Sequence, residues 1–134
     1  QYIDYFMPSY IEAKYLTGET EPEKMADYLI NKTGDKTIII KLGEEGCFVK
    51  NKARRFYMDP YIEQPVDTTG AGDNFVAGFI SALLEEQDLH YCAKFACATA
   101  ALSIKSLGAT CNKIDRDQVL MYMETTKQRS LQRL

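Results

Sequence analysis

Residues 66–79, with the sequence Val-Asp-Thr-Thr-Gly-Ala-Gly-Asp-Asn-Phe-Val-Ala-Gly-Phe, constrain this chain more than any other segment. Glycines on both sides of Ala71 free the backbone to turn sharply, just before the apolar run from Phe75 that predicts a helix. Such a turn points successive N–H groups into one concavity, and a helix start adds roughly half a positive charge there. The segment therefore predicts an anion seat that suits a phosphoryl group.

Asp73 follows these glycines directly. A carboxylate beside a phosphate seat is repelled by the anion, so its presence indicates that it takes a proton from an incoming hydroxyl or handles a metal ion. The pattern favours phosphoryl transfer to an alcohol. A tight turn followed by a helix cap is the structural alternative, because glycines and aspartates are common between a strand and a helix.

Three segments resemble one family of enzymes. Residues 67–73 resemble the C-terminal signature of the ribokinase-like (PfkB) carbohydrate kinases, Asp-Thr-x-Gly-Ala-Gly-Asp followed by a helix of small and apolar residues. Residues 8–18 are similar to the family's Pro-Asn-x-x-Glu-Ala-x-x-Leu-Thr-Gly stretch, and residues 38–46 to its strand ending in Leu-Gly-x-x-Gly. The likeness continues to residues 108–109 and keeps the family's order. It implies an ATP-dependent sugar kinase.

The chain has 134 residues, whereas members of that family are much longer and carry their sugar-binding half and lid before these motifs. We therefore expect residues 1–134 to be the C-terminal nucleotide-binding and catalytic part of a single ribokinase-like domain. The implied fold is α/β, part of a three-layer structure with a mostly parallel sheet flanked by helices, with the N-terminal half and lid missing. The first residue is Gln1 rather than Met, and residues 2–6 predict a strand already in progress.

Periodicity and turn residues predict the remaining elements. Helices are expected over residues 10–16, from 22 to Gly34 with Thr20 or Glu21 as cap, over 72–86, from 88 to about 107, and after Asp115 or Asp117. Residues 37–42 predict a strand buried on both faces, and residues 47–50 and 55–58 predict an antiparallel pair. The polar residues after the last helix are expected to fray.

Composition narrows the function classes. The chain is 46% hydrophobic and 26% charged, as suits a globular domain, and its net charge of -3 with scattered basic residues argues against a nucleic-acid partner. No apolar run approaches the roughly 20 residues that span a bilayer, so we expect no membrane partner and a cytoplasmic location. The cysteines form no C-x-x-C pair and are expected to be free thiols. They are Cys47, Cys92, Cys97 and Cys111.

The resemblance assigns roles to the motif residues. Asp73 would be the general base, and the N–H groups of Gly70, Ala71 and Gly72 would hold the charge that develops on the transferred phosphate. The residues implied for ATP are Leu42, Gly43, Gly46, Gly72 and Cys97. Cys97 would lie near the adenine, and its alternative is simple packing as a small hydrophobe.

Metal positions are also implied by the resemblance. The family's Asn-x-x-Glu appears here as Ser9-Tyr10-Ile11-Glu12, so Glu12 would order waters bound to Mg²⁺, while Ser9 is explained equally by helix capping. Many relatives hold a monovalent cation such as K⁺ beside the anion seat. The oxygen ligands implied for it are Asp67, Thr69, Ser103, Ser106, Gly108 and Asn112. Asp67 as a strand-end cap stays open.

Two functions of different class follow. In the first, the chain is the catalytic half of a kinase whose partners are ATP and a small-molecule sugar, or a nucleoside. In the second, the isolated chain is an inactive nucleotide-binding or assembly module until its N-terminal portion is supplied. The acceptor stays open because the residues that would discriminate acceptors lie upstream of Gln1. The resemblance also allows a homodimer of the whole protein, since relatives often pair through the lid.

Overall fold

The computed structural model describes residues 4–61, 70–105 and 114–133. The residues Asp67, Thr69, Ser106, Gly108, Cys111 and Asn112, to which the sequence analysis gives roles, lie outside these ranges. The chain forms two compact units, Gln1–Met58 and Asp59–Leu134, and each is described by itself. None of the helices in the described ranges has the length and apolar character that crossing a membrane requires.

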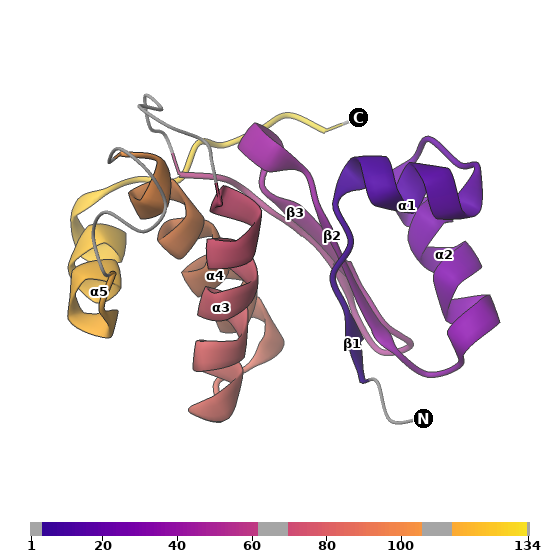
Figure 1. Ribbon diagram of the computed structural model, residues 1–134, viewed down its shortest axis with the longest axis horizontal. Coiled ribbons are helices and arrows are strands. Elements are labelled where there is room, and N and C mark those ends of the chain that lie inside the picture. The colour runs from indigo at the N-terminus through magenta and orange to yellow at the C-terminus, as the bar shows by residue number, and fades with distance from the viewer. Residues whose placement is uncertain (1–3, 62–69, 106–113, 134) are drawn as a thin grey trace. The chain divides into compact units, whose positions relative to one another are not determined.

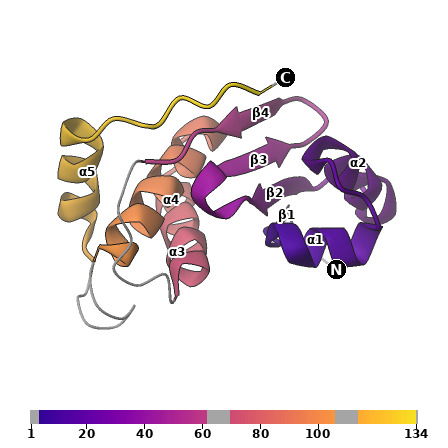
Figure 2. The ribbon, with the colours of Figure 1, turned by 90° about the horizontal axis from the view of Figure 1, so that it is seen from above.

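The first unit holds a four-stranded sheet in the order β1-β2-β3-β4 (Figure 2). Its strands are β1 (Tyr5–Phe6), β2 (Thr37–Lys41), β3 (Cys47–Lys50) and β4 (Arg55–Met58). Its helices are α1 (Tyr10–Thr17), α2 (Pro22–Thr33) and the short 3₁₀ turn η1 (Gly43–Glu45). These bounds agree closely with the sequence pattern, and β3 and β4 form the expected antiparallel pair, with Phe48 opposite Tyr57.

The described sheet is mixed rather than mostly parallel. Strand β2 pairs in parallel with β1, but β2 with β3 and β3 with β4 are antiparallel. The reason lies in the connections: residues 42–46 and 51–54 are too few for the crossover that parallel neighbours need, whereas α1 and α2 together supply one between β1 and β2. The α/β class is confirmed, and the sheet direction is corrected for these strands.

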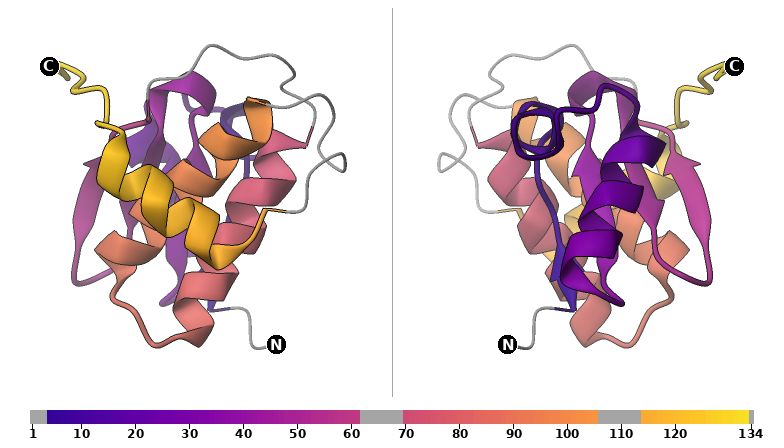
Figure 3. Two further views of the ribbon diagram at one scale, coloured as in Figure 1. Left: turned by 90° about the vertical axis from the view of Figure 1, so that its left-hand side faces the viewer. Right: turned by 90° about the vertical axis from the view of Figure 1, so that its right-hand side faces the viewer.

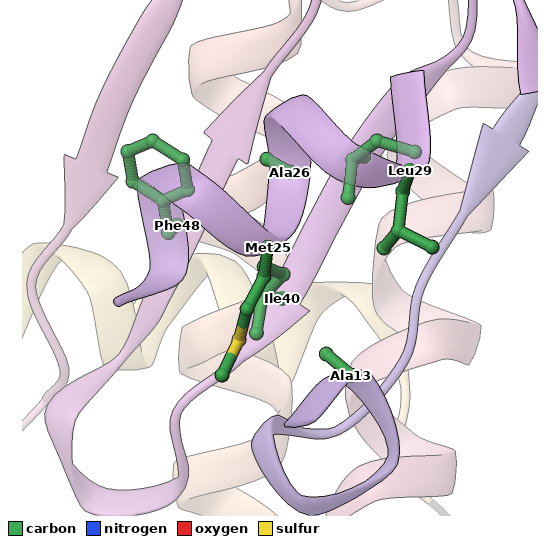
Figure 4. Packing of buried hydrophobic residues seen from close by; sticks show 7 residues of the cluster. Ala13, Met25, Ala26, Leu29, Ile40 and Phe48 are labelled. Atoms are coloured by element: carbon green, nitrogen blue, oxygen red, sulfur yellow. The ribbon is translucent and has the colours of Figure 1, made fainter. Parts of the chain in front are cut away.

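One face of the sheet packs against α1 and α2. Ile38, Ile40 and Phe48 from the strands meet helix residues such as Met25 and Leu29 in one buried cluster (Figure 4). Ile39, which points to the opposite face of β2, is also fully buried. The prediction that this strand is buried on both faces is therefore confirmed.

The caps of the two helices follow the sequence, with one exception. Ser9 and Glu12 form a capping box at the start of α1, and Gly18 ends α1 in the left-handed conformation with a φ of 74°. Glu21 is the N-cap residue of α2, but its side chain makes no capping bond. That carboxylate instead lies 3.4 Å from the ammonium group of Lys24.

The second unit is helical in the described ranges, with α3 (Ala71–Leu84), α4 (Leu89–Ile104) and α5 (Arg116–Thr125) (Figure 1). Helix α3 packs along α4, and α5 crosses α4 (Figure 3, left). Asp88 and Asp115 cap α4 and α5 through their side chains. Cys92 and Cys97 on α4 and Cys47 in the first unit are buried, and none of the three forms a disulfide.

The segment after α5 does not fray as expected. The Arg129 N–H donates to the carbonyl of Pro60 at 2.7 Å, and the Gln128 side-chain amide donates to the carbonyl of Asp59 at 2.7 Å. The Arg133 guanidinium lies 2.6 Å from the Asp59 carboxylate. This polar tail is held because its donors find carbonyl and carboxylate partners at residues 59 and 60.

Gly78 sets the close approach of α3 to α4. A Cβ at Gly78 would lie 2.6 Å from Thr99 Oγ1, 2.8 Å from Thr99 Cβ and 3.3 Å from the Ala96 Cα. The first two distances are shorter than real Cβ atoms show, and Thr99 cannot swing away freely because its hydroxyl donates to the Phe95 carbonyl at 2.8 Å. The helix pair therefore needs glycine at this position.

We predict that Gly78→Ala lowers the free energy of unfolding by about 1–3 kcal/mol, since overpacking outweighs the gain of about 1 kcal/mol in helix propensity. Urea unfolding of the 134-residue chain measures it. Ala77→Ser is the matched control: it also adds one heavy atom, at the exposed neighbouring position, and should stay within about 0.5 kcal/mol of the parent. A stabilised Gly78→Ala chain would contradict the packing.

Candidate functional site

Helix α3 begins without a side-chain cap. Gly70 is its N-cap residue, with a φ of 78° in the left-handed region that glycine adopts readily. The first N–H groups of any helix have no partner inside the helix, and those of Ala71, Gly72 and Asp73 donate to no residue within 4–61, 70–105 and 114–133. With respect to these described residues, the start of α3 thus has unpartnered donors beside the positive end of the helix dipole, an arrangement that suits an anion.

Comparison with the other helices makes this start distinctive. The Asp88 carboxylate accepts from the Tyr91 N–H at 2.8 Å, and the Asp115 carboxylate accepts from the Gln118 N–H at 2.8 Å. Helix α2 also lacks a capping side chain, but it begins with Pro22, which has no N–H to satisfy. Among the α-helices that the structure describes, α3 alone begins with three first-turn N–H groups that no described residue caps.

Asp73 is the third residue of α3, and its side chain is exposed. Within the described part of the chain, its carboxylate has no hydrogen bond or ion pair. Its oxygens are therefore not committed to capping its own helix. The structure brings Gly70, Ala71, Gly72 and Asp73 together at one helix start, with donors and a carboxylate side by side.

Asn74 contributes a contact that the sequence analysis did not single out. Its backbone N–H and its side-chain amide nitrogen Nδ2 both donate to the carbonyl oxygen of Gly70, at 2.9 Å and 3.0 Å. The available signal was the position of a polar amide four residues after Gly70, where a side chain can reach back one helical turn.

The residues implied for the nucleotide in the first unit form one tight loop. The Leu42 N–H donates to the carbonyl of Gly46 at 2.9 Å, and the Gly46 N–H donates to that of Gly43 at 3.2 Å. Both glycines have positive φ, 62° at Gly43 and 85° at Gly46. A Cβ at Gly43 would meet nothing within 4 Å, so the backbone conformation, and not space within the described structure, calls for glycine there.

Cys97 lies on α4 with 6% of its surface exposed, among other small buried residues. That burial agrees with packing as a small hydrophobe, and its place beside an adenine stays a prediction. Tyr61 is a second group that sequence reasoning missed: it is 6% exposed and packs against Tyr122, with ring centroids 5.3 Å apart. No described residue partners its hydroxyl, and burial, helped by Cys97 and Tyr91, raises the pKa of Tyr61 to about 12.

Ser9 and Glu12 form reciprocal hydrogen bonds at the start of α1. The Ser9 N–H donates to Glu12 Oε1 at 2.8 Å, and the Glu12 N–H donates to the Ser9 hydroxyl oxygen at 3.2 Å. The hydrogen bonds from Ser9 hold the pKa of Glu12 below its ordinary value of 4.5. The capping explanation of Ser9 is confirmed. Glu12 stays an exposed carboxylate, which suits a water-mediated contact to a magnesium ion.

Of the residues implied for a monovalent cation, Ser103 alone lies in the described ranges. It is 1% exposed, and its hydroxyl donates to the Ala100 carbonyl at 2.7 Å, which leaves its oxygen lone pairs for another partner. No three His, Cys, Asp or Glu side chains gather as a metal cluster among the residues that the structure covers.

Comparison with known proteins decides the family. The model of the pfkB family carbohydrate kinases matches residues 1–115. The chain belongs to this family. The three motifs therefore belong to a PfkB protein. In chain order they form the capped helix α1, the loop at Gly43 and the start of α3.

Named relatives agree with the PfkB assignment. The chain is 36% identical over 127 residues to a ribokinase from Haemophilus influenzae, covering 91% of this chain and 41% of that protein. It is 31% identical over 125 residues to a 2-dehydro-3-deoxygluconokinase from Bacillus subtilis, covering 92% of this chain and 38% of that protein. The chain therefore spans about two-fifths of the length of these relatives.

A solved structure confirms the fold of this PfkB chain. Arabidopsis thaliana ribokinase, complexed with ribose and ATP, superposes with a TM-score of 0.83 at 34% sequence identity. The match covers 91% of this chain and 41% of the plant protein. The ribokinase-like fold is shown for the described elements.

The capping box generates a stability prediction. Ser9→Ala should lower the free energy of unfolding by about 1 kcal/mol, because the Glu12 N–H loses its acceptor. It should also raise the pKa of Glu12 part of the way toward 4.5, measured by an NMR pH titration of the side-chain carboxyl, because the larger cause, the hydrogen bond from the N–H of residue 9, is kept. Because the folded pKa lies below the unfolded one, the contribution of Glu12 is present above about pH 4.5 and is lost as the pH falls.

Ser9→Asn is the matched control, since asparagine caps helices as well as serine does. It also introduces the residue of the family's pattern. We expect it to keep both the stability and the low pKa of Glu12. Equal losses in the alanine and asparagine variants would show that the hydroxyl is not what holds this helix start.

Proposed function

We propose that this chain is the C-terminal nucleotide-binding and catalytic part of a sugar kinase that transfers the terminal phosphoryl group of ATP to a hydroxyl. The observation that carries the proposal is the first turn of α3, which no described side chain caps, with the exposed carboxylate of Asp73 beside it. Membership of the PfkB carbohydrate kinases supports the same chemistry. The relatives named as ribokinases support a sugar acceptor.

In the proposed step, Asp73 accepts the proton of the acceptor hydroxyl as its oxygen bonds to the γ-phosphorus. The bond from that phosphorus to the bridging oxygen breaks, and ADP leaves. The N–H groups of Gly70, Ala71 and Gly72 donate to the oxygens of the transferred group, whose negative charge they stabilise. The left-handed turn at Gly70 and the helix that follows support this assignment, since they direct N–H groups of the first turn outward.

The nucleotide would be held by Leu42, Gly43 and Gly46 in one loop, and by Gly72 and Cys97. Positive φ at Gly43 and Gly46 supports a loop whose backbone faces a ligand closely. The Arabidopsis relative was solved with ribose and ATP, which supports ATP as the phosphoryl donor.

Ions would assist this step. Mg²⁺ neutralises phosphate charge when bound, and Glu12, a carboxylate kept ionised by its capping bonds, fits the task of ordering its waters. The proposed ligands of a K⁺ ion are Asp67, Thr69, Ser103, Ser106, Gly108 and Asn112. Ser103 suits this role because its hydroxyl hydrogen is donated to the Ala100 carbonyl, while the lone pairs of its oxygen are left for a cation.

The acceptor and the assembly belong to the same proposal. Relatives named as ribokinase and as 2-dehydro-3-deoxygluconokinase match this chain almost equally, so the described residues do not select between a pentose and a sugar acid. A nucleoside is the second candidate acceptor. We propose a cytoplasmic enzyme, where ATP and sugars meet, and a homodimer for the whole protein.

Substitution of the proposed base is the direct test. Asp73→Asn in the longest polypeptide that contains this chain should lower kcat by about 10²–10⁴-fold, with little change in stability because the carboxylate is exposed. Sugar-dependent ADP release over a panel of sugars and nucleosides measures it. Asp117→Asn, an exposed carboxylate of α5, is the matched control and should keep full activity. Full activity of the Asp73→Asn enzyme would refute the assignment.

The 134-residue chain by itself is expected to bind nucleotide but to release no ADP in a sugar-dependent manner. The reason is that positioning of the acceptor is a large share of catalysis, and the chain spans 41% of its ribokinase relative. The same coupled assay, run on the chain and on the longer polypeptide, makes the comparison. Turnover by the chain alone would contradict the inactive-module alternative; none by the longer protein would count against the kinase.

A further inference from the structure

The side chain of Asn74 donates a hydrogen bond to a carbonyl oxygen that already accepts one from the backbone. The Gly70 oxygen accepts the ordinary helical bond from the Asn74 backbone N–H at 2.9 Å, and it accepts a second bond from Asn74 Nδ2 at 3.0 Å. A capping side chain acts in the opposite sense, since it accepts from unpaired N–H groups of the first turn. The Asn74 bond therefore satisfies no orphan group of the backbone, and it calls for another explanation.

The geometry of the peptide unit supplies one. In a planar trans peptide the carbonyl of one residue and the N–H of the next point in opposite directions. The carbonyl of Gly70 and the N–H of Ala71 belong to one such unit. Two donors on the Gly70 oxygen therefore fix the rotation of this plane, and with it the direction of the Ala71 N–H.

Rotation of this plane would otherwise be easy. The rotation of this plane is set by the ψ of Gly70, which is 4°, together with the φ of Ala71, and because Gly70 has no Cβ its ψ can change with little steric penalty. The helix restrains the plane through one hydrogen bond at its first turn, where helices open most readily. A half-buried side-chain amide adds the second restraint from within the same turn.

We propose that Asn74 is a positioning residue for phosphoryl transfer: its side-chain amide holds the Gly70–Ala71 peptide so that the Ala71 N–H points out of the helix toward the transferred group. This inference rests on the proposed function of the same helix start. Asn74 touches neither the nucleotide nor the acceptor in this scheme. It acts through Ala71, and its loss misdirects a donor rather than removing one.

The chain itself suggests a sharp pair of variants. Thr17, Thr33 and Thr99 each donate a hydroxyl to the carbonyl four residues earlier, at 2.7, 2.7 and 2.8 Å. Asn74→Thr can make the same bond to the Gly70 oxygen. Valine has nearly the same shape as threonine but no hydrogen-bond donor. The variants Asn74→Thr and Asn74→Val therefore differ chiefly in the hydrogen bond under test.

In the longest polypeptide containing this chain, we expect Asn74→Val to lower kcat by about 10-fold or more, a fraction of the 10²–10³-fold that loss of a whole oxyanion donor costs. The KM for ATP and for the sugar should change by less than about threefold, because ground-state binding is kept. Asn74→Thr should recover most of kcat. Both variants should unfold at the same urea concentration, which separates positioning from stability.

Equal kcat values for the threonine and valine enzymes would overturn the inference. A second measurement does not depend on turnover: the ¹⁵N order parameter of the Ala71 amide in the 134-residue chain should fall in Asn74→Val and not in Asn74→Thr. An unchanged Ala71 amide in the valine variant would also overturn it. If the longer protein transfers no phosphoryl group at all, the proposed function fails, while the amide measurement still decides whether Asn74 directs Ala71.

Discussion

The amide groups at the start of α3 are the feature on which the proposed anion seat of the second unit depends. A helix end normally satisfies these donors with a side chain, as Asp88 and Asp115 do for α4 and α5. For α3 no described side chain does so, and such a cap would contribute about 1 kcal/mol. The open end is instead defined by backbone features: Gly70 in the left-handed conformation and a carbonyl held by two donors of Asn74. Helix formation thus supplies the donors that the proposed anion seat requires.

Helix α3 has an exposed polar start and a buried apolar continuation. Asp73 in the first turn is exposed, while Phe75, Gly78 and Phe79, further along the helix, are buried. The close fit of Gly78 against Thr99 fixes α3 along α4, so the direction of the helix axis, and hence of its dipole, is set by packing. The proposed chemistry at one end depends on a steric fit in the middle.

Much of this structure followed from the sequence, because local signals dominate it. Pro22, Gly18, Gly34 and Asp115 mark helix ends through their own backbone or side-chain preferences, and β3 and β4 were predicted with the bounds observed. The family and the α/β class were likewise readable from ordered motifs. The direction of β2 against its neighbours is a tertiary property, and an apolar run such as residues 38–40 reads alike in parallel and antiparallel sheets.

Other features depend on contacts between residues distant in the chain or on the choice of a side-chain rotamer. The bond from Asn74 Nδ2 could not be inferred because an amide in a first turn can equally point to water. The hydroxyl of Tyr61 is buried with no partner among the described residues, and no local sequence pattern reveals that burial. The roles of Asp73, Cys97 and the proposed ion ligands stay predictions, since they concern ligands rather than the fold.

The clasp between the last residues and residues 59–60 has a practical meaning for handling this protein. Gln128, Arg129 and Arg133 act as a latch whose partners are Asp59 and Pro60, just ahead of the stretch that leads to the glycine-rich motif. A purification tag or a protease that acts after α5 would therefore affect these contacts with residues 59 and 60. Changes to residues 128–133 would therefore remove restraints from residues 59 and 60, which lie far from them in the sequence.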